Sequence, residues 1–99
     1  MKIIEIDGSG WSERLDFFDA LRTALGACPG HGWGFAAFED SVFYGGMLEV
    51  EPPFTVIVRN CPHTFRTDVE TMAQGWYEQR QWKKENYGED VDPTIVVEP

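Results

Sequence analysis

Residues 54–58 are Phe-Thr-Val-Ile-Val, a nearly continuous apolar run that follows a break in the chain at Glu51-Pro52-Pro53. β-branched and aromatic side chains favour strands. A strand without alternating polar residues is typical of one covered on both faces or lying in a parallel sheet. We therefore expect residues 54–59 to form the central strand of the fold.

Two further runs of the same character lie near the ends of the chain. Ile3 to Ile6 is short, rich in isoleucine and stopped by Asp7-Gly8, which predicts a strand over residues 2–6 followed by a turn. Residues 94–97 are Thr-Ile-Val-Val, and the preceding Pro93 is acceptable at the first position of a strand. The sequence thus predicts three strands.

Three helical patterns separate these strands. The recurring apolar positions are Leu15, Phe18, Leu21 and Leu25, then Phe35, Phe38 and Val42, and finally Phe65, Val69, Met72 and Trp76. Their spacing is helical. Ser12 is a suitable N-cap for the first helix, Gly26 and Gly45 are expected to end the first two, and the third extends toward Gly88 and could bend at Gly75.

The resulting order is β, α, α, β, α, β. Helical crossovers between strands favour parallel pairing, with the helices on one side. A chain of 99 residues with 42% hydrophobic content suffices for one core. We therefore predict a single α/β domain over residues 1–99, with two layers and a three-stranded parallel sheet.

The charge balance restricts the partners. Seventeen acidic residues against eight basic ones give a net charge of -9, which argues against the phosphate-neutralising surface that nucleic-acid binding requires. A field of this sign attracts a cationic protein, although solubility explains an acidic surface equally simply. Both explanations stay open on charge alone.

The chain has no segment typical of secretion or of a membrane. An acidic residue interrupts the N-terminus before any secretory apolar stretch develops, and no apolar run approaches the roughly 20 residues that span a bilayer. We expect a cytoplasmic monomer without membrane contacts. In a reducing compartment Cys28 and Cys61 are expected to remain thiols.

Several segments together resemble the barstar family of ribonuclease inhibitors. They are Ile6-Asp7-Gly8, Phe17-Phe18-Asp19-Ala20-Leu21, the glycine corner His31-Gly32-Trp33-Gly34, and Phe35-Ala36-Ala37-Phe38-Glu39-Asp40. The similarity is sharpest from Asp7 to Gly46. It implies strand order 1-2-3, and an inhibitory surface formed by the loop around His31 and the helix that follows it.

The resemblance also implies Asp40 and the loop residue His31 as site residues, and we add Glu39 for its charge next to Asp40 and Trp33 for its place in the same loop. Asp40 would enter the nuclease active site where a substrate phosphate lies, because a carboxylate accepts charge-assisted hydrogen bonds from the cations that clamp phosphate. Glu39 adds charge about 100° away around the helix. His31 could stack, hydrogen-bond or be a solvent-exposed loop residue, and Trp33 is either an interface anchor or a lid on the core.

The departures from the family pattern leave a second function class open. Gly34 stands where the family usually has asparagine, and Ala36 stands where it has the first aspartate of the helix, so one of two expected acidic contacts is absent. The chain could therefore be a structural or interaction protein with this fold that has lost ribonuclease inhibition.

A metal site and an enzyme are the remaining alternatives. Cys28, His31, Cys61 and His63 have the ligand chemistry of tetrahedral zinc, but the Cys-x-His spacing is tighter than usual. No nucleophile elbow, phosphate-binding loop or His-Glu-x-x-His motif is present. We therefore expect no catalytic activity, no bound metal and no cofactor.

Overall fold

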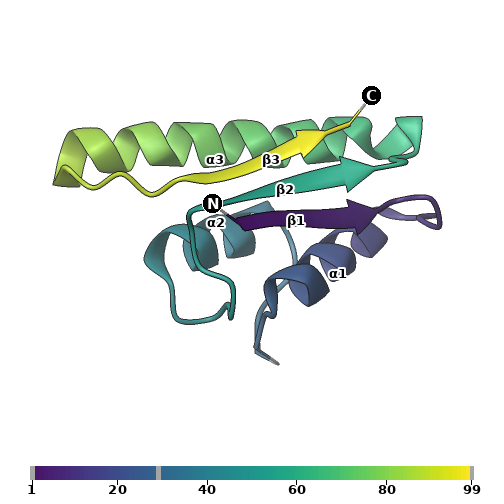
Figure 1. Cartoon of the computed structure of the whole chain (residues 1–99), viewed down its shortest axis with the longest axis horizontal. Coiled ribbons are helices and arrows are strands. Elements are labelled where there is room, and N and C mark those ends of the chain that lie inside the picture. Colours follow the sequence, from purple (N-terminus) through teal and green to yellow (C-terminus); the bar gives the residue numbers. More distant parts are fainter. Residues whose placement is uncertain (1, 29, 99) are drawn as a thin grey trace.

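The computed structural model describes residues 2–28 and 30–98 (Figure 1). The elements are β1 (Lys2–Asp7), α1 (Arg14–Leu25), α2 (Phe35–Tyr44), β2 (Phe54–Arg59), the 3-10 turn η1 (His63–Phe65), α3 (Arg66–Tyr87) and β3 (Pro93–Val97). Among the described residues, no helix is both long enough and apolar enough to cross a membrane.

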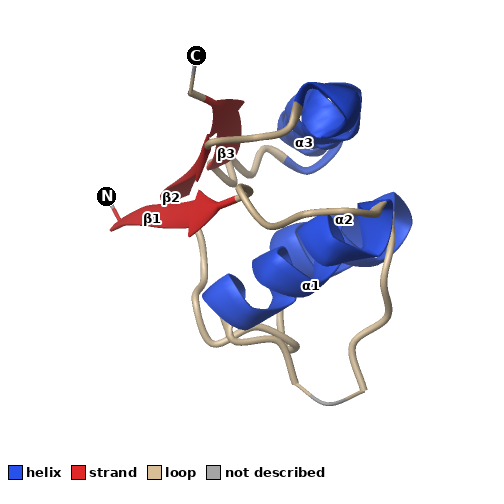
Figure 2. Ribbon diagram, turned by 90° about the vertical axis from the view of Figure 1, so that its right-hand side faces the viewer, coloured by secondary structure: helices blue, strands red, loops and turns tan. Residues whose placement is uncertain are grey.

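The three strands form one parallel sheet in the order β1-β2-β3, which confirms the predicted α/β class and strand order. Ile4 pairs with Val56, and Val56 pairs with Ile95. Figure 2 shows α1, α2 and α3 on the same face of this sheet. Parallel strands need long connections, and here helices supply them, all on one side.

The opposite face of the sheet is open. Side chains alternate along β2, so that Phe54, Val56 and Val58 are fully buried while the residues between them are only partly covered. Ile3, on the open face of β1, is 59% exposed. Of the two explanations for the apolar run, parallel pairing therefore holds, and cover on both faces is wrong.

Helix α1 differs from the prediction at its first turn. Its N-cap is Glu13 rather than Ser12, because the Asp16 carboxylate accepts hydrogen bonds from the backbone N–H groups of both residues, at 3.1 Å and 2.7 Å. Within this helix Phe17 lies in the core, with 0% exposure, whereas Leu15 is 45% exposed. The core side of α1 thus contains Phe17, and placing Leu15 there was wrong.

The other two helices follow their predicted patterns closely. Phe38 and Val42 hold α2 on the core, and Val69, Met72 and Trp76 hold α3. The Trp76 ring meets Phe54 of β2 edge-on, with centroids 6.0 Å apart. α3 runs through Gly75 as one continuous helix and ends at Gly88, which adopts a left-handed conformation (φ 69°).

The burial of Phe17 and the exposure of Leu15 give a test of the fold. Phe17→Ala should lower the free energy of unfolding by about 3–5 kcal/mol, because the ring is fully buried and leaves a cavity. Leu15→Ala should cost less than about 1 kcal/mol, since this side chain is already half in water. Urea unfolding of both variants measures the difference, and equal losses would contradict the helix orientation.

Candidate protein-binding site

Helix α2 presents one side to the core and the other to solvent. Phe38, Ser41, Val42 and Phe43 are buried. Ala36, Asp40 and Tyr44, spaced four residues apart, are exposed on the opposite side. The predicted exposure of Asp40 is confirmed, and its role in binding remains a prediction.

The start of α2 explains one departure from the barstar pattern. Gly34 is the N-cap residue, with φ 111° and ψ 172°. This region of backbone space is essentially restricted to glycine, because a β-carbon would clash with the backbone. An asparagine at this position would be strained, so the glycine follows from the path of this loop.

A shallow groove lies between α2 and α3 and consists of two adjoining hollows of about 210 and 330 Å³. Its lining residues are Ala36, Glu39, Asp40 and Tyr44 from α2, and Glu78, Gln79 and Trp82 from α3. We call it the α2/α3 groove. Gln79 donates a hydrogen bond of 3.1 Å to the Tyr44 hydroxyl and so joins its two walls.

Glu39 is the least solvated acid of this groove. One of its carboxylate oxygens lies 3.2 Å from the point where a β-carbon on Gly75 would stand, so the absence of a side chain there lets Glu39 approach α3. Partial burial, and then the charge of Glu78, raise the pKa of the Glu39 carboxyl above its ordinary value. Ionised Glu39 therefore lowers the stability of the folded state.

No basic side chain of the described residues forms an ion pair with Glu39, Asp40 or Glu78. Six of the eight basic residues pair with other acids: Arg14, Arg22, Arg59, Arg66, Arg80 and Lys83. Lys83 lies over the ring of Tyr44, with its Nζ 4.5 Å from the ring centroid. That ammonium is buried and donates to the Phe43 carbonyl oxygen at 2.5 Å, so it holds the end of α2 in place.

His31 lies beneath the surface, with only 4% of it exposed. Its Nδ1 donates to the Gly32 carbonyl oxygen at 2.6 Å, and its Nε2 lies 2.6 Å from the Ser41 hydroxyl oxygen. The imidazole also packs on Phe38, with centroids 4.8 Å apart. Of the alternatives, stacking and hydrogen bonding are thus observed, and a solvent-exposed loop residue is wrong.

The Ser41 hydroxyl oxygen lies within hydrogen-bond distance of His31 Nε2, as a catalytic serine does of its general base. Both are buried, however, and the Ser41 hydroxyl also lies 2.9 Å from the Ala37 carbonyl oxygen of its own helix. Neither residue lines any of the pockets described. Their contact ties the loop before α2 to the helix itself.

Trp33 lies on the surface, with 54% exposure, and is not a lid on the core. Its ring stacks against the Arg22 guanidinium of α1, with 4.8 Å between Cζ and the ring centroid. This contact fixes an exposed aromatic side chain just before α2. Trp33 is thus available to a partner, while its participation remains a prediction.

The alternative zinc ligands are not brought together. Among residues 2–28 and 30–98, no three His, Cys, Asp or Glu side chains are grouped so as to hold a metal ion. The Cys28 sulfur instead lies 3.9 Å from that of Met47, and the Cys61 sulfur lies 3.5 Å from the Pro62 carbonyl oxygen. Burial raises the pKa of the Cys61 thiol, which favours its neutral form.

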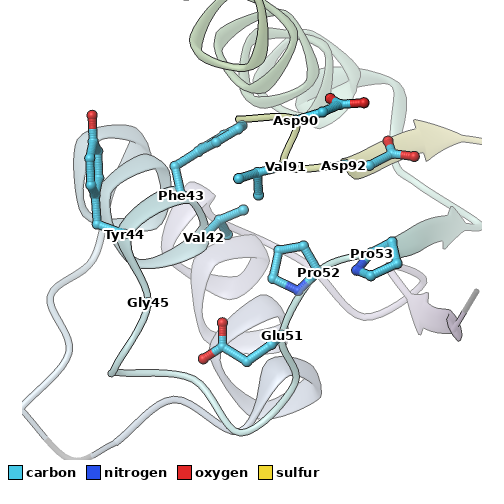
Figure 3. Close-up of a pocket in the computed structure, with 10 residues that line it drawn as sticks. All are labelled: Val42, Phe43, Tyr44, Gly45, Glu51, Pro52, Pro53, Asp90, Val91 and Asp92. Atoms are coloured by element: carbon cyan, nitrogen blue, oxygen red, sulfur yellow. The ribbon is translucent and has the colours of Figure 1, made fainter. Parts of the chain in front are cut away.

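A larger pocket, of about 560 Å³, lies at the C-terminal end of α2 (Figure 3). Its lining residues are Val42, Phe43, Tyr44, Gly45, Glu51, Pro52, Pro53, Asp90, Val91 and Asp92. Arg80 binds Asp90 at 2.7 Å and Asp92 at 2.8 Å, and its hydrogen bonds lower the pKa of Asp90. Asp90 and Asp92 of this pocket are therefore already paired, unlike the carboxylates of the α2/α3 groove.

Sequence patterns alone missed the α3 wall of the groove. Glu78 and Trp82 are four residues apart and thus share one side of α3, which is a signal that the sequence does contain. Nothing in that spacing indicates that the shared side borders α2, because the contact arises from packing between the helices. The groove therefore extends the predicted site by Tyr44, Glu78, Gln79 and Trp82.

The raised pKa of Glu39 predicts a pH-dependent gain in stability on its removal. Because folding raises this pKa, the folded chain binds more protons than the unfolded chain just above the ordinary value of 4.5, and stability falls as pH rises through that window. Glu39→Gln should therefore stabilise the protein near pH 7 and change it little at about pH 4. Urea unfolding of both proteins at both pH values measures this, and a pH-independent difference would contradict it.

Comparison of the sequence with protein-family models and with curated proteins found no match. The resemblance to barstar-type inhibitors therefore stays a prediction from the sequence segments named above.

Proposed function

We propose that this chain binds a basic protein through the α2/α3 groove, and that the partner is a ribonuclease whose active site it blocks. The observation that carries the proposal is a set of carboxylates, Glu39, Asp40 and Glu78, that no basic side chain of the described residues neutralises. They border a groove walled by Tyr44 and Trp82. A solubilising surface does not need acids that share a groove with aromatic rings.

The chemistry of a ribonuclease active site fits this arrangement. Such a site holds arginine and lysine side chains that bind phosphate, and carboxylates can take the place of the phosphate oxygens. Tyrosine and tryptophan are enriched at protein interfaces and also attract cations to their ring faces. Asp40, exposed at the centre of α2, is the group that would reach deepest into the partner.

The exposed position of Ala36 has a consequence for the choice of nuclease. It lines the same hollow as Asp40 and contributes no charge there, so the first half of α2 offers less negative charge than the barstar pattern implies. Glu39 and Glu78 supply charge toward α3 instead. We therefore expect a partner whose cations lie toward α3.

Replacement of Asp40 tests this function directly. With a basic ribonuclease from the same cell, Asp40→Ala should weaken binding by about 2–5 kcal/mol, because the nuclease cations lose their partner inside the interface. The free energy of unfolding should change by less than about 1 kcal/mol, since the side chain is exposed. Titration calorimetry and nuclease inhibition measure the first, and urea unfolding measures the second.

Glu85→Ala is the matched control, because Glu85 is also an exposed helical acid but lines neither hollow. It removes the same net charge and should leave affinity nearly unchanged. Equal losses of affinity in both variants would show that the overall charge, and not the position of Asp40, causes the effect. Unchanged affinity in Asp40→Ala, with a native melting temperature, would place the site elsewhere and favour a protein that has lost ribonuclease inhibition.

The net charge of -9 predicts a second property, salt-dependent association. Exposed charges are screened beyond about 8 Å at physiological ionic strength, so the association rate with a basic partner should fall as salt rises. Stopped-flow mixing at several salt concentrations measures this rate. An association rate that is independent of salt would contradict electrostatic attraction of the partner.

A further inference from the structure

Strand β3 is one edge of the sheet, and its outer backbone groups face away from β2. The Asp92 carbonyl oxygen accepts from Phe54 N–H at 3.2 Å, and Glu98 N–H donates to the Val58 carbonyl oxygen at 2.9 Å. Since backbone groups alternate in direction along a strand, those of Ile95 and Val97 point away from β2. Within the described part of the chain, no residue forms a hydrogen bond with these outer groups.

β3 and α3 lie side by side (Figures 1 and 2). Two hollows follow this edge between them. One, of about 190 Å³, is lined by residues 95–97 of β3 and by Arg66, Val69, Glu70 and Ala73 of α3. The other, of about 160 Å³, is lined by residues 93–95 and by Ala73, Tyr77 and Arg80. Neither is lined by β2, so both lie on the outer side of β3, and we call them the β3/α3 groove.

The edge also lacks the usual protection against strand pairing. Exposed edges are commonly blocked by charged side chains, bulges or proline. β3 has Pro93 at its first position, where it leaves the rest of the strand free to pair, and the remaining residues, Thr-Ile-Val-Val, carry no charge. Val96, on the open face of this strand, is 44% exposed. The side chains of residues 94–97 therefore do not prevent another strand from pairing with this edge.

We propose that the β3/α3 groove binds an extended segment of a basic partner protein, which adds as a fourth strand beside β3. The outer N–H and C=O groups match the main chain of such a segment. The hollows are offset by two residues of β3, which is the repeat of side chains on one face of a strand. Two apolar side chains of the segment would enter the two hollows, which share Ala73, with its small side chain, as a lining residue.

Charge distinguishes this occupant from a second copy of the chain. Each copy carries a net charge of -9, which opposes pairing of two identical edges. At one end of the groove Arg66 and Glu70 pair with each other, and beside the other end Asp90 and Asp92 outnumber the single cation of Arg80 that binds them. A segment with basic residues flanking its apolar ones is therefore favoured. This surface lies outside the α2/α3 groove and does not depend on Asp40.

The test uses a capped peptide of sequence Lys-Val-Thr-Val-Thr-Val-Lys and the whole protein labelled with nitrogen-15. Titration should give saturable amide shifts that are largest at Ile95 and Val97. A peptide with proline in place of the first threonine and of the central valine lacks an N–H donor on each of its two edges, so it should cause no saturable shift whichever edge faces β3. Ala73→Leu, which fills the space shared by the two hollows, should weaken binding about tenfold.

The controls separate this proposal from the proposed function. Asp40→Ala should bind the peptide like the wild type, whatever its effect on a ribonuclease. The absence of saturable shifts, shifts centred on α2 or on the open face of the sheet, or equal binding of the proline peptide would each overturn the proposal. A dimer in sedimentation that Ala73→Leu converts to a monomer would overturn it in favour of a second copy of the chain.

Discussion

The burial of one face of β2 determines the position of every helix in this chain. Phe54, Val56 and Val58 are fully buried on that face, and β2 pairs in parallel with both of its neighbours. The chain must return to the start of the sheet before each new strand, and its helices do so over the same face. α2 therefore has one side in the core and the other in solvent. The candidate site lies on the side that the core does not use.

This constraint explains how much of the fold could be predicted. β-branched runs and helical spacing predict the strands, the helices and parallel pairing, because these depend on local composition and chain order. The side of α1 that faces the core was predicted wrongly at Leu15, although Phe17 stands four residues before Leu21 and eight before Leu25 and so shares their side of the helix. The Asp16 carboxylate fixes where the helix begins, through backbone hydrogen bonds that a sequence pattern does not resolve.

The candidate site was predictable only in part, for a related reason. Asp40 could be placed on the exposed side of α2 from the positions of Phe38 and Val42, because all three lie on one helix. Glu78 could not be assigned to the same groove, because its approach to Glu39 depends on how α2 packs on α3. His31 has a polar side chain in a glycine-rich loop, which gives no indication of burial. Its hydrogen bonds to Gly32 and Ser41 become visible only in the folded chain.

The distribution of ion pairs connects stability with binding. Exposed pairs such as Arg59 with Glu5 contribute little to stability individually. Their greater effect is on the surface field, because each pair occupies a cation that would otherwise be free to neutralise acids elsewhere. Glu39 is left partly buried near Glu78 without such a cation, and its ionisation opposes folding. A basic partner that supplies the missing cation would relieve this cost on binding, and would therefore gain affinity from a destabilising feature of the free protein.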